Sequence, residues 1–418
     1  MLNNKTAWAT VSLRCFWLPV LTLFFAINMN YDWRTSSLVW YGCLALVCAA
    51  YYVGFSARFL IKDVSFITWF VSFVGLGVCS LAWSLSAGTG MDVVKSMVVI
   101  LAVLLLVQSS ANFGFSVDSM LRGFFVAILV NMLYVVSNID MKELGSIQLG
   151  TNLIEGWNGN GIGFMAAQGV LIGCYLFGRS NRNAGKLFYL VCNILLGFLT
   201  LYTGSRTAFI MLVLELILYY CLRHPSKMLR NIIISVFVLI GALYLVMTVE
   251  SFYNVLGSRL EGLFALFSGD GRVDHSSSVR DIFIQNGKEW FLDQPLFGYG
   301  INNYKVLNLE ATGKFTYAHN NFVELAVDLG IVGLVWYYSV YIYLGVQLLK
   351  RLNKSPLNVF LLSALLASLI SQYGTVEYYG FYQNYLLCLC FVGINQSRKE
   401  KGETYNERKT KKGLAKMV

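Results

Sequence analysis

Charged residues and prolines are scarce in this sequence. Asp, Glu, Lys and Arg make up 13% of the 418 residues, and there are only four prolines. A soluble domain is typically about 25% charged, so this chain has too little charge to cover an ordinary water-facing surface. With 57% hydrophobic residues and few helix breakers, long apolar helices can form without interruption. The composition predicts an all-α fold and a polytopic integral membrane protein.

Motifs that mark metal or cofactor chemistry are also missing. No CxxC occurs, and the nine cysteines all fall in apolar stretches, which is typical of small buried residues rather than disulfides or metal ligands. His319 has no HExxH or DxD near it, and the other two histidines, His224 and His275, stand apart from it. A P-loop and a GxSxG elbow are absent as well. We therefore expect no metal and no cofactor.

Apolar runs long enough to cross a membrane recur along the chain, since a span needs about 20 apolar residues. The first run follows Arg14 without a convincing cleavage site, so we expect it to stay in the protein as a helix. The Gly-Ser-Arg turn at Arg206 interrupts the region 187–222, which could be divided differently. Twelve spans are predicted, near 15–31, 38–57, 64–84, 92–111, 117–137, 157–178, 187–203, 206–222, 231–250, 321–349, 357–373 and 380–395.

Lys and Arg are distributed unevenly between the two sets of loops. Twenty-one of them precede the first span or fall in alternate loops and the tail, against nine in the remaining loops. The positive-inside rule then puts both termini in the cytoplasm. The predicted organisation is nine spans in 1–250, one large extracytoplasmic loop in 251–318, three spans in 319–396 and a basic cytoplasmic tail in 397–418.

The net charge of +10 could suggest a nucleic-acid partner, but its placement indicates otherwise. Eight basic residues lie in the tail 397–418, and most others lie in short loops. That pattern is a topology signal with some attraction to anionic lipid head groups. We expect the lipid bilayer and no nucleic acid as a partner, and a solvated, disordered tail rather than a specific lipid site.

The loop 251–318 contains a segment with helical periodicity. Across 279–291, apolar residues recur at helical spacing with charges between them, and the serines 276–278 precede them as candidate N-caps. The run 293–300, with a proline and two glycines, ends this helix and turns the chain. Long loops in compact proteins tend to carry function. The alternative is an amphipathic helix that lies on the membrane surface.

Polar residues concentrate where this loop enters the tenth span. Asn320, Glu324 and Asp328 recur every four residues, so they form one stripe on a helix, and His319 lies at its top. Ionisable groups on a membrane-length helix are costly and usually mark a site. The alternative is that His319 is an interfacial residue that caps the helix.

Arg206, Arg280 and His319 all fall on the predicted extracytoplasmic face. Arginine forks bind phosphate oxygens bidentately, and a histidine can take a proton from an attacking hydroxyl. Two arginines and one base suit a transfer that breaks a bond to a pyrophosphate leaving group, because charge builds on the phosphate as the bond breaks. The alternative for each arginine is that it reaches towards lipid head groups.

The order of these motifs resembles the O-antigen ligase and O-antigen polymerase superfamily of bacterial membrane glycosyltransferases. The similarity covers mainly residues 155–345, and spans one to five carry no matching motif. The matching pieces are Thr203–Thr207, Ser278–Arg280, Pro295–Gly300, Ala318–Asn321 followed by Gly330 and Gly333, and, more loosely, Trp157–Gly161.

The resemblance implies a GT-C-like fold and transfer of a glycan from an undecaprenyl-pyrophosphate carrier, without a metal, at the outer leaflet of the bacterial inner membrane. It implies that Arg206 and Arg280 hold the pyrophosphate and that His319 activates or orients the acceptor hydroxyl. Asn320 and Asn160 are further substrate-binding candidates. A polymerase of the family passes the chain to another lipid-linked repeat unit, and a ligase passes it to lipid A–core.

Several hypotheses follow for the function. The His-Asn-Asn run with Asp-Leu-Gly further on is closer to the polymerases of capsule and exopolysaccharide clusters, so a polysaccharide polymerase is the leading one. A ligase of the same chemistry is the close alternative. A lipid-linked glycan transporter should instead show polar residues at mid-membrane along a path. A non-catalytic chain-length factor usually has a long coiled or soluble region, and the sequence lacks heptads.

Overall fold

The described part of the chain is almost entirely helical. The computed structural model describes residues 14–139, 152–154, 157–257, 260–261 and 275–414. One helix in it coincides with each of the twelve predicted spans. These helices are α2 (Trp17–Met29), α4 (Ser37–Gly54), α5 (Ser65–Ser80), α6 (Ala87–Asn112), α7 (Val117–Asn138), α8 (Gly159–Arg179), α9 (Asn183–Tyr202), α10 (Arg206–Arg223), α11 (Met228–Thr248), α16 (Asn321–Leu349), α17 (Pro356–Ser371) and α18 (Phe381–Leu414).

Shorter elements connect these helices. The region predicted as the large loop contributes two well-formed helices, α14 and α15, and the segment before α8 contributes a small antiparallel pair of strands. The connecting elements are α3 (Tyr31–Thr35), β1 (Asn152–Ile154), β2 (Trp157–Asn158), η2 (Pro225–Lys227), α12 (Glu250–Phe252), η3 (Tyr253–Gly257), α14 (His275–Asp293), α15 (Tyr304–Thr312) and η4 (Leu352–Lys354).

Length and composition make this an all-α, multi-pass membrane protein, as the sequence predicts. Within the described ranges, seven helices are long and apolar enough to cross a membrane, and three shorter ones are also apolar. The seven are α4, α6, α7, α8, α9, α11 with η2, and α16. The total number of crossings, the GT-C-like arrangement and the sidedness of the loops stay predictions.

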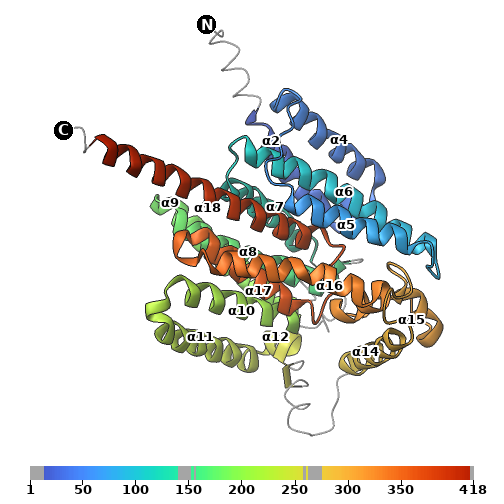
Figure 1. Cartoon of the computed structure of the whole chain (residues 1–418). Helices are drawn as coiled ribbons and strands as arrows, with labels where there is room; N and C mark the ends of the chain where they lie inside the picture. The colour runs from blue at the N-terminus through green and yellow to red at the C-terminus, as the bar shows by residue number, and fades with distance from the viewer. Residues whose placement is uncertain (1–13, 140–151, 155–156, 258–259, 262–274, 415–418) are drawn as a thin grey trace.

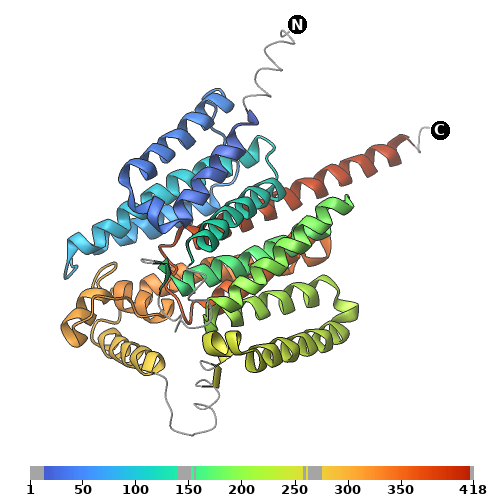
Figure 2. The same ribbon diagram turned by 180° about the vertical axis from the view of Figure 1, so that it is seen from behind.

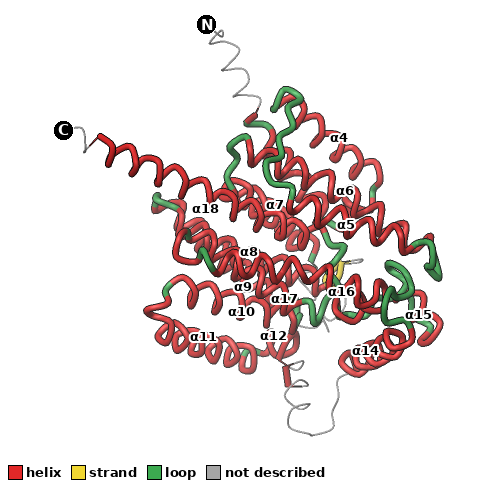
Figure 3. Tube along the Cα trace, viewed as in Figure 1, coloured by secondary structure: helices red, strands yellow, loops and turns green. Residues whose placement is uncertain are grey.

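The two ends of the helical bundle differ. α14 and α15 gather beside the first part of α16 at one end, and the last turns of α18 project from the opposite end (Figures 1 and 2). The strands β1 and β2 lie among the helix ends near α16 (Figure 3). The basic segment from Ser397 continues α18 as far as Leu414. Our expectation of a disordered tail is therefore wrong for these residues.

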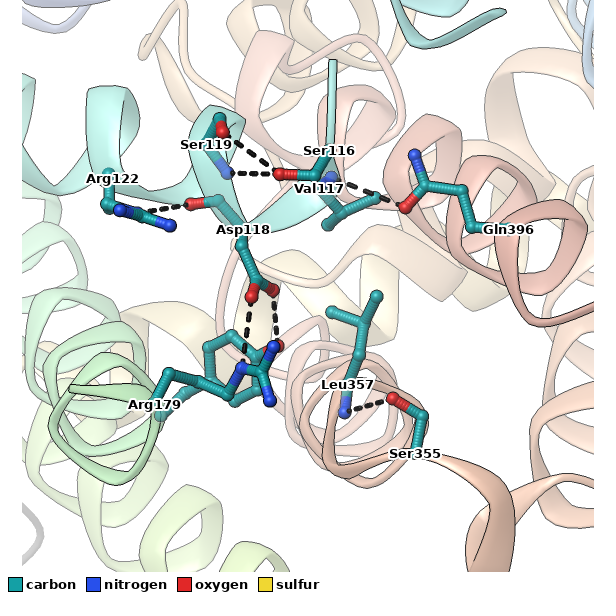
Figure 4. Close-up of polar contacts among 10 residues, drawn as sticks. Ser116, Val117, Asp118, Ser119, Arg122, Arg179, Ser355, Leu357 and Gln396 are labelled. Atoms are coloured by element: carbon teal, nitrogen blue, oxygen red, sulfur yellow. Dashed lines mark hydrogen bonds and ion pairs between the residues drawn. The ribbon is translucent and has the colours of Figure 1, made fainter. Parts of the chain in front are cut away.

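The first turn of α7 is tied to two other helices by polar contacts (Figure 4). Asp118 accepts hydrogen bonds from the Tyr175 hydroxyl and, at 3.0 Å, from the Arg179 Nε, both on α8. Gln396 of α18 accepts from the α7 backbone at 3.4 Å. Arg122, which the sequence places inside the fifth span, lies one turn into α7 with its Nε 3.4 Å from the Asp118 carbonyl. These contacts fix α7 and α8 at their charged ends.

Helix α16 is broken at Gly330, whose φ of 64° and ψ of −167° are not helical. Residues 295–300 fill the break and exchange backbone hydrogen bonds with it. Two of the four bonds go into the helix: the Tyr299 N–H donates to the Val327 carbonyl and the Gly300 N–H to the Asp328 carbonyl, both at 2.9 Å. The other two come out of it: the Ile331 N–H donates to the Pro295 carbonyl at 2.8 Å and the Val332 N–H to the Leu296 carbonyl at 3.3 Å. In an unbroken helix the last two N–H groups would donate to the first two carbonyls. These four backbone groups, freed by the break, are therefore all paired again.

Glycine is required where these two backbones cross. A Cβ on Gly330 would lie 2.2 Å from the Leu296 carbonyl oxygen, and one on Gly298, whose φ is 62°, would lie 2.3 Å from the Val327 oxygen. Both distances are too short for real atoms, and both backbones are in the left-handed region that favours glycine. The motifs 295–300 and 328–333 are thus two halves of one structural unit. The predicted helix end before 295–300 is confirmed, because α14 ends at Asp293.

The chain after this crossing is fastened to the turn between α5 and α6. The Ile301 N–H donates to the Ser80 hydroxyl at 3.0 Å. The Asn303 side chain accepts from the Ser86 N–H at 2.8 Å and donates to the Ser84 hydroxyl at 2.6 Å. Since α15 begins at the next residue, these bonds hold the loop helices firmly against the bundle.

Candidate active site

The backbone at His319 is held in an unusual conformation by the residues on either side of it. Its φ is +54°, in a region that few residues other than glycine adopt and that costs of order 1–3 kcal/mol. On one side, the Ala318 N–H donates to Glu324 Oε2 at 2.7 Å. On the other side, Asn320 Oδ1 accepts from the N–H groups two and three residues later, at 3.0 and 3.1 Å. Asn320, not His319, therefore caps α16, and the capping alternative for His319 is wrong.

The His319 imidazole contacts two aromatic rings. Its centroid lies 6.4 Å from that of Phe283, with the planes within 7° of parallel, and 4.1 Å from that of Tyr317, with a tilt of 44°. The side chain is half-buried. Burial, with a smaller contribution from the charge of Arg280, lowers the pKa of His319 from its ordinary 6.5 to about 4. The imidazole is therefore neutral near pH 7 and can accept a proton.

Arg280 approaches His319 from α14. It lies one turn before Phe283, so a single helix supplies both the cation and the ring that contacts the imidazole. Phe283 is buried, and its carbonyl accepts a hydrogen bond from the Tyr304 hydroxyl at 2.7 Å. α14 packs on α16. It therefore contacts the helical bundle and is not a helix that lies only on the membrane surface.

The start of α14 also differs from expectation. The helix begins at His275, so the serines 276–278 lie in its first turn instead of preceding it. Our interpretation of them as N-caps is wrong. The residues 262–274, which precede the helix and belong to the predicted loop, lie outside the described residues.

The acidic residues of the predicted stripe bind neighbouring segments. Glu324 and Asp328 are fully buried. Asp328 Oδ1 accepts from the Tyr304 N–H and Oδ2 accepts from the Tyr378 hydroxyl, both at 2.7 Å. Lys305 lies close enough to act electrostatically on both carboxylates. The stripe that the spacing predicts therefore serves to hold α15 and the α17–α18 loop around the start of α16.

Asn321 fastens the α17–α18 loop, a role that the sequence did not indicate. Its Oδ1 accepts from the N–H groups of Glu377 (2.8 Å) and Tyr378 (2.9 Å). Its Nδ2 donates to Tyr338 Oη and Gln372 Oε1, both at 2.9 Å. All the polar capacity of this buried amide is thus used in positioning. The only sequence signal was that a second asparagine follows Asn320.

Glu377 is an acid that the sequence analysis also missed. Its side chain is half-buried in the α17–α18 loop, and burial raises the pKa of its carboxyl to about 7. The group can therefore hold or release a proton close to neutral pH. It lies on the same short loop that Asn321 ties to the helix after His319.

Arg206 and Asn160 come together at another part of the same end of the bundle. Arg206 is the first residue of α10, whose N-cap is Ser205. The Ser205 hydroxyl donates to Asn160 Oδ1 at 2.7 Å. Thr207, the next residue, packs against Gly374 of the α17–α18 loop, with its Cγ2 2.8 Å from where a glycine Cβ would lie. This loop therefore touches the Arg206 turn and is bonded to Asn321.

The structure thus forms two pairs from the predicted site residues. His319 and Arg280 are one pair, and Asn160 and the Arg206 turn are the other. The α17–α18 loop, with Glu377 on it, connects the two. That His319, Arg280 and Arg206 converge around one substrate stays a prediction. The arrangement offers His319 as a neutral base beside the Arg280 cation, with Arg206 as a second cation on the turn that the α17–α18 loop touches. Two cations near one base suit a reaction with an anionic leaving group.

Comparison with known proteins agrees with the resemblance seen in the motifs. Residues 191–338 match the family model described as O-antigen ligase. This stretch contains Arg206, Arg280 and His319 and both halves of the α16 crossing. No curated protein matches the chain. The fold and site define a multi-pass membrane protein with a polar centre at one end of its bundle. Its similarity to the O-antigen ligase and polymerase superfamily is confirmed, which supports an enzymatic role of that type.

Proposed function

We propose that this protein polymerises oligosaccharide repeat units carried on undecaprenyl pyrophosphate, in the synthesis of a bacterial surface polysaccharide such as O-antigen, capsule or exopolysaccharide. The observation that carries the proposal is the half-buried His319, held against the ring of Phe283 from the same helix as Arg280, within the segment similar to O-antigen ligases. The protein would lie in the cytoplasmic membrane, with both termini in the cytoplasm and the site on the outside. The uneven distribution of Lys and Arg supports this orientation.

The proposed reaction is a glycosyl transfer in which no metal takes part. The acceptor hydroxyl oxygen, on a glycan or a lipid-linked repeat, forms a bond to the anomeric carbon of the donor glycan. The bond between that carbon and the pyrophosphate oxygen breaks, and the hydroxyl proton passes to an imidazole nitrogen of His319. Arg206 and Arg280 hold the pyrophosphate and stabilise the charge that develops on it. Asn320 and Asn160 would hydrogen-bond to the substrates near each end of the site.

A ligase that passes the glycan to lipid A–core is the alternative with the same chemistry. The match to a model described as O-antigen ligase favours it, whereas the His-Asn-Asn run favours a polymerase. A lipid-linked glycan transporter is the alternative from another class. His319 lies just before α16 and Arg206 opens α10, and these positions at helix ends support an enzyme over a transport path.

The test uses the purified full-length chain in detergent with an undecaprenyl-pyrophosphate-linked repeat unit. Wild type should extend the repeats into a ladder, and His319→Asn should lower the rate by about two to four orders of magnitude. Asparagine is chosen because it tolerates the left-handed backbone at this position, so folding should be preserved. A His319→Asn ladder equal to that of wild type would remove the proposal. Product formed only when lipid A–core is added would establish the ligase instead.

A further inference from the structure

An apolar groove runs between α7 and α9, with a cavity volume of about 480 Å³. Leu129, Leu133 and Val136 line it from α7, and Leu195, Leu199 and Tyr202 line it from α9. Apart from the Cys192 thiol and the Tyr202 hydroxyl, the lining side chains carry no polar group. In a membrane-spanning protein, such a groove can hold a hydrocarbon chain.

The fold defines both ends of this groove. Partway along it, Gly169 of α8 lets Ile128 of α7 and Leu196 of α9 both approach α8, because a Cβ there would lie 2.8 Å from Leu196 and 3.0 Å from Ile128. At one end, Phe125 of α7 contacts the ring of Tyr189 at 5.6 Å between centroids. The lining residues from Phe188 to Tyr202 cover roughly 21 Å of helix. That length is a large part of the roughly 30 Å hydrocarbon core of a bilayer.

Tyr202 closes the other end and has an unusual feature. Its side chain is only 4% exposed, and its hydroxyl has no hydrogen-bond partner among the described residues. Buried hydroxyls are nearly always paired, so this one points to a polar group supplied by a ligand. The ring is held in place by stacking on Phe198, with centroids 6.2 Å apart and planes within 7°.

The position of Tyr202 links the groove to the candidate active site. It is the last residue of α9, and Arg206 opens α10 four residues later. An apolar groove therefore ends at a hydroxyl donor and, just beyond it, a permanent cation. This order matches an amphiphile with a long hydrocarbon tail and a phosphate-bearing head.

We propose that the α7–α9 groove binds the polyprenyl tail of the lipid-linked donor and that the Tyr202 hydroxyl donates to an oxygen of its pyrophosphate. The identity of the donor rests on the proposed function; the groove and its chemistry do not. A phospholipid has the same hydrocarbon chemistry, so the experiment must separate the two lipids. A second apolar groove of about 420 Å³, between α9, α10 and α11, includes Ile234 and provides the matched control.

The binding test places a benzophenone side chain at Leu133 or, as the control, at Ile234 of the full-length protein. Each variant is reconstituted in phosphatidylglycerol vesicles that contain a few per cent of undecaprenyl pyrophosphate, irradiated and analysed by mass spectrometry. The proposal expects undecaprenyl adducts at position 133 in several-fold excess over position 234. Equal labelling at the two positions, or phospholipid adducts alone at 133, would overturn it.

Two substitutions then test the tail and the head separately. Leu133→Trp fills the groove, so the ratio of KM for an undecaprenyl-linked donor to KM for a farnesyl-linked donor should rise several-fold, whereas Ile234→Trp should leave this ratio unchanged. Tyr202→Phe should weaken crosslinking of undecaprenyl pyrophosphate at position 133 while that of undecaprenol is retained. An unchanged KM ratio in Leu133→Trp, or equal loss of both lipids in Tyr202→Phe, would contradict the proposal.

The outcomes also separate this inference from the function on which it rests. If wild type extends neither donor but position 133 still captures undecaprenyl pyrophosphate, the groove assignment holds and the polymerase proposal fails. If wild type polymerises and position 133 captures no polyprenyl chain, the polymerase proposal holds and the groove assignment fails.

Discussion

The His319 imidazole lies parallel to the ring of Phe283, with planes within 7° and centroids 6.4 Å apart. Phe283 follows Arg280 by one turn of α14, so a loop helix brings a cation and an aromatic face to the histidine together. Since the Tyr304 hydroxyl is bonded to the Phe283 carbonyl at 2.7 Å, α14 cannot slide without disturbing the environment of the imidazole. The chemistry at His319 therefore depends on how the loop is packed.

We expect Phe283→Leu to weaken transfer by altering the surroundings of His319. A smaller, non-planar side chain lets water reach the imidazole, so the depression of its pKa should diminish and the acid limb of the kcat/KM profile should move to higher pH. The profile between pH 4 and 8 measures this. Leu309→Ala, at an exposed position of α15, is the control. An acid limb at the wild-type pH in Phe283→Leu would show that the ring contact has no bearing on the base.

The pH dependence of wild type follows from the lowered pKa of His319. A base with a pKa of about 4 is deprotonated above that pH. Activity should therefore persist below pH 6.5, the pH at which an ordinary histidine is half protonated. Arg280→Gln removes a cation that disfavours the imidazolium, so the pKa should rise and the acid limb should move upward. The shift should be partial because burial is the larger cause. A limb that moves to lower pH would contradict this assignment.

Glu324→Ala should impair both stability and transfer. The substitution leaves the buried Ala318 N–H without the acceptor that now lies 2.7 Å away, which costs about 1–3 kcal/mol. It also frees the strained backbone at His319. Glu324→Gln keeps a side-chain oxygen and should retain most of the stability and activity. Thermal unfolding in detergent and single-turnover rates measure the two effects, and equal losses in both variants would point to charge instead of the hydrogen bond.

Gly330→Ala should prevent correct assembly of the α16 crossing. The added methyl would lie 2.2 Å from the Leu296 carbonyl oxygen, and the left-handed backbone adds about 1 kcal/mol or more. Gly345→Ala is the matched control in the same helix, because a Cβ there meets nothing within 4 Å. Yield of folded protein and melting temperature measure the difference. Similar behaviour of the two variants would mean that residues 295–300 do not enter the break.

Much of the fold could be predicted from the sequence because the relevant signals are local. Apolar length predicts where the helices lie, and the Gly-Ser-Arg turn correctly divides α9 from α10. The proline and glycines of 295–300 correctly predict the end of α14. The basic tail was mispredicted, because high charge is compatible both with disorder and with the continued helix α18.

Fewer features of the candidate site could be predicted from the sequence. The spacing of Asn320, Glu324 and Asp328 predicts their stripe. The assignment of the N-cap depends instead on the extended backbone of Asn320 and on the two N–H groups that its side chain accepts from, which spacing does not report. Asn321 and Glu377 are 56 residues apart, and no local pattern relates them. Their contact exists because a buried amide must satisfy its hydrogen bonds with whichever backbone packs against it.

The sequence by itself determined that this chain is a helical membrane protein with a few polar residues at helix ends, because burial of apolar side chains in lipid needs only composition and length. Only the tertiary structure decided that residues 295–300 repair the break at Gly330 and that α14 places Arg280 and Phe283 on His319. The tertiary structure alone also shows that the Tyr202 hydroxyl, at the end of a groove, has no hydrogen-bond partner within the described part of the chain. Hydrogen bonds and ring contacts are directional and join distant segments, so they are fixed only when the chain has packed.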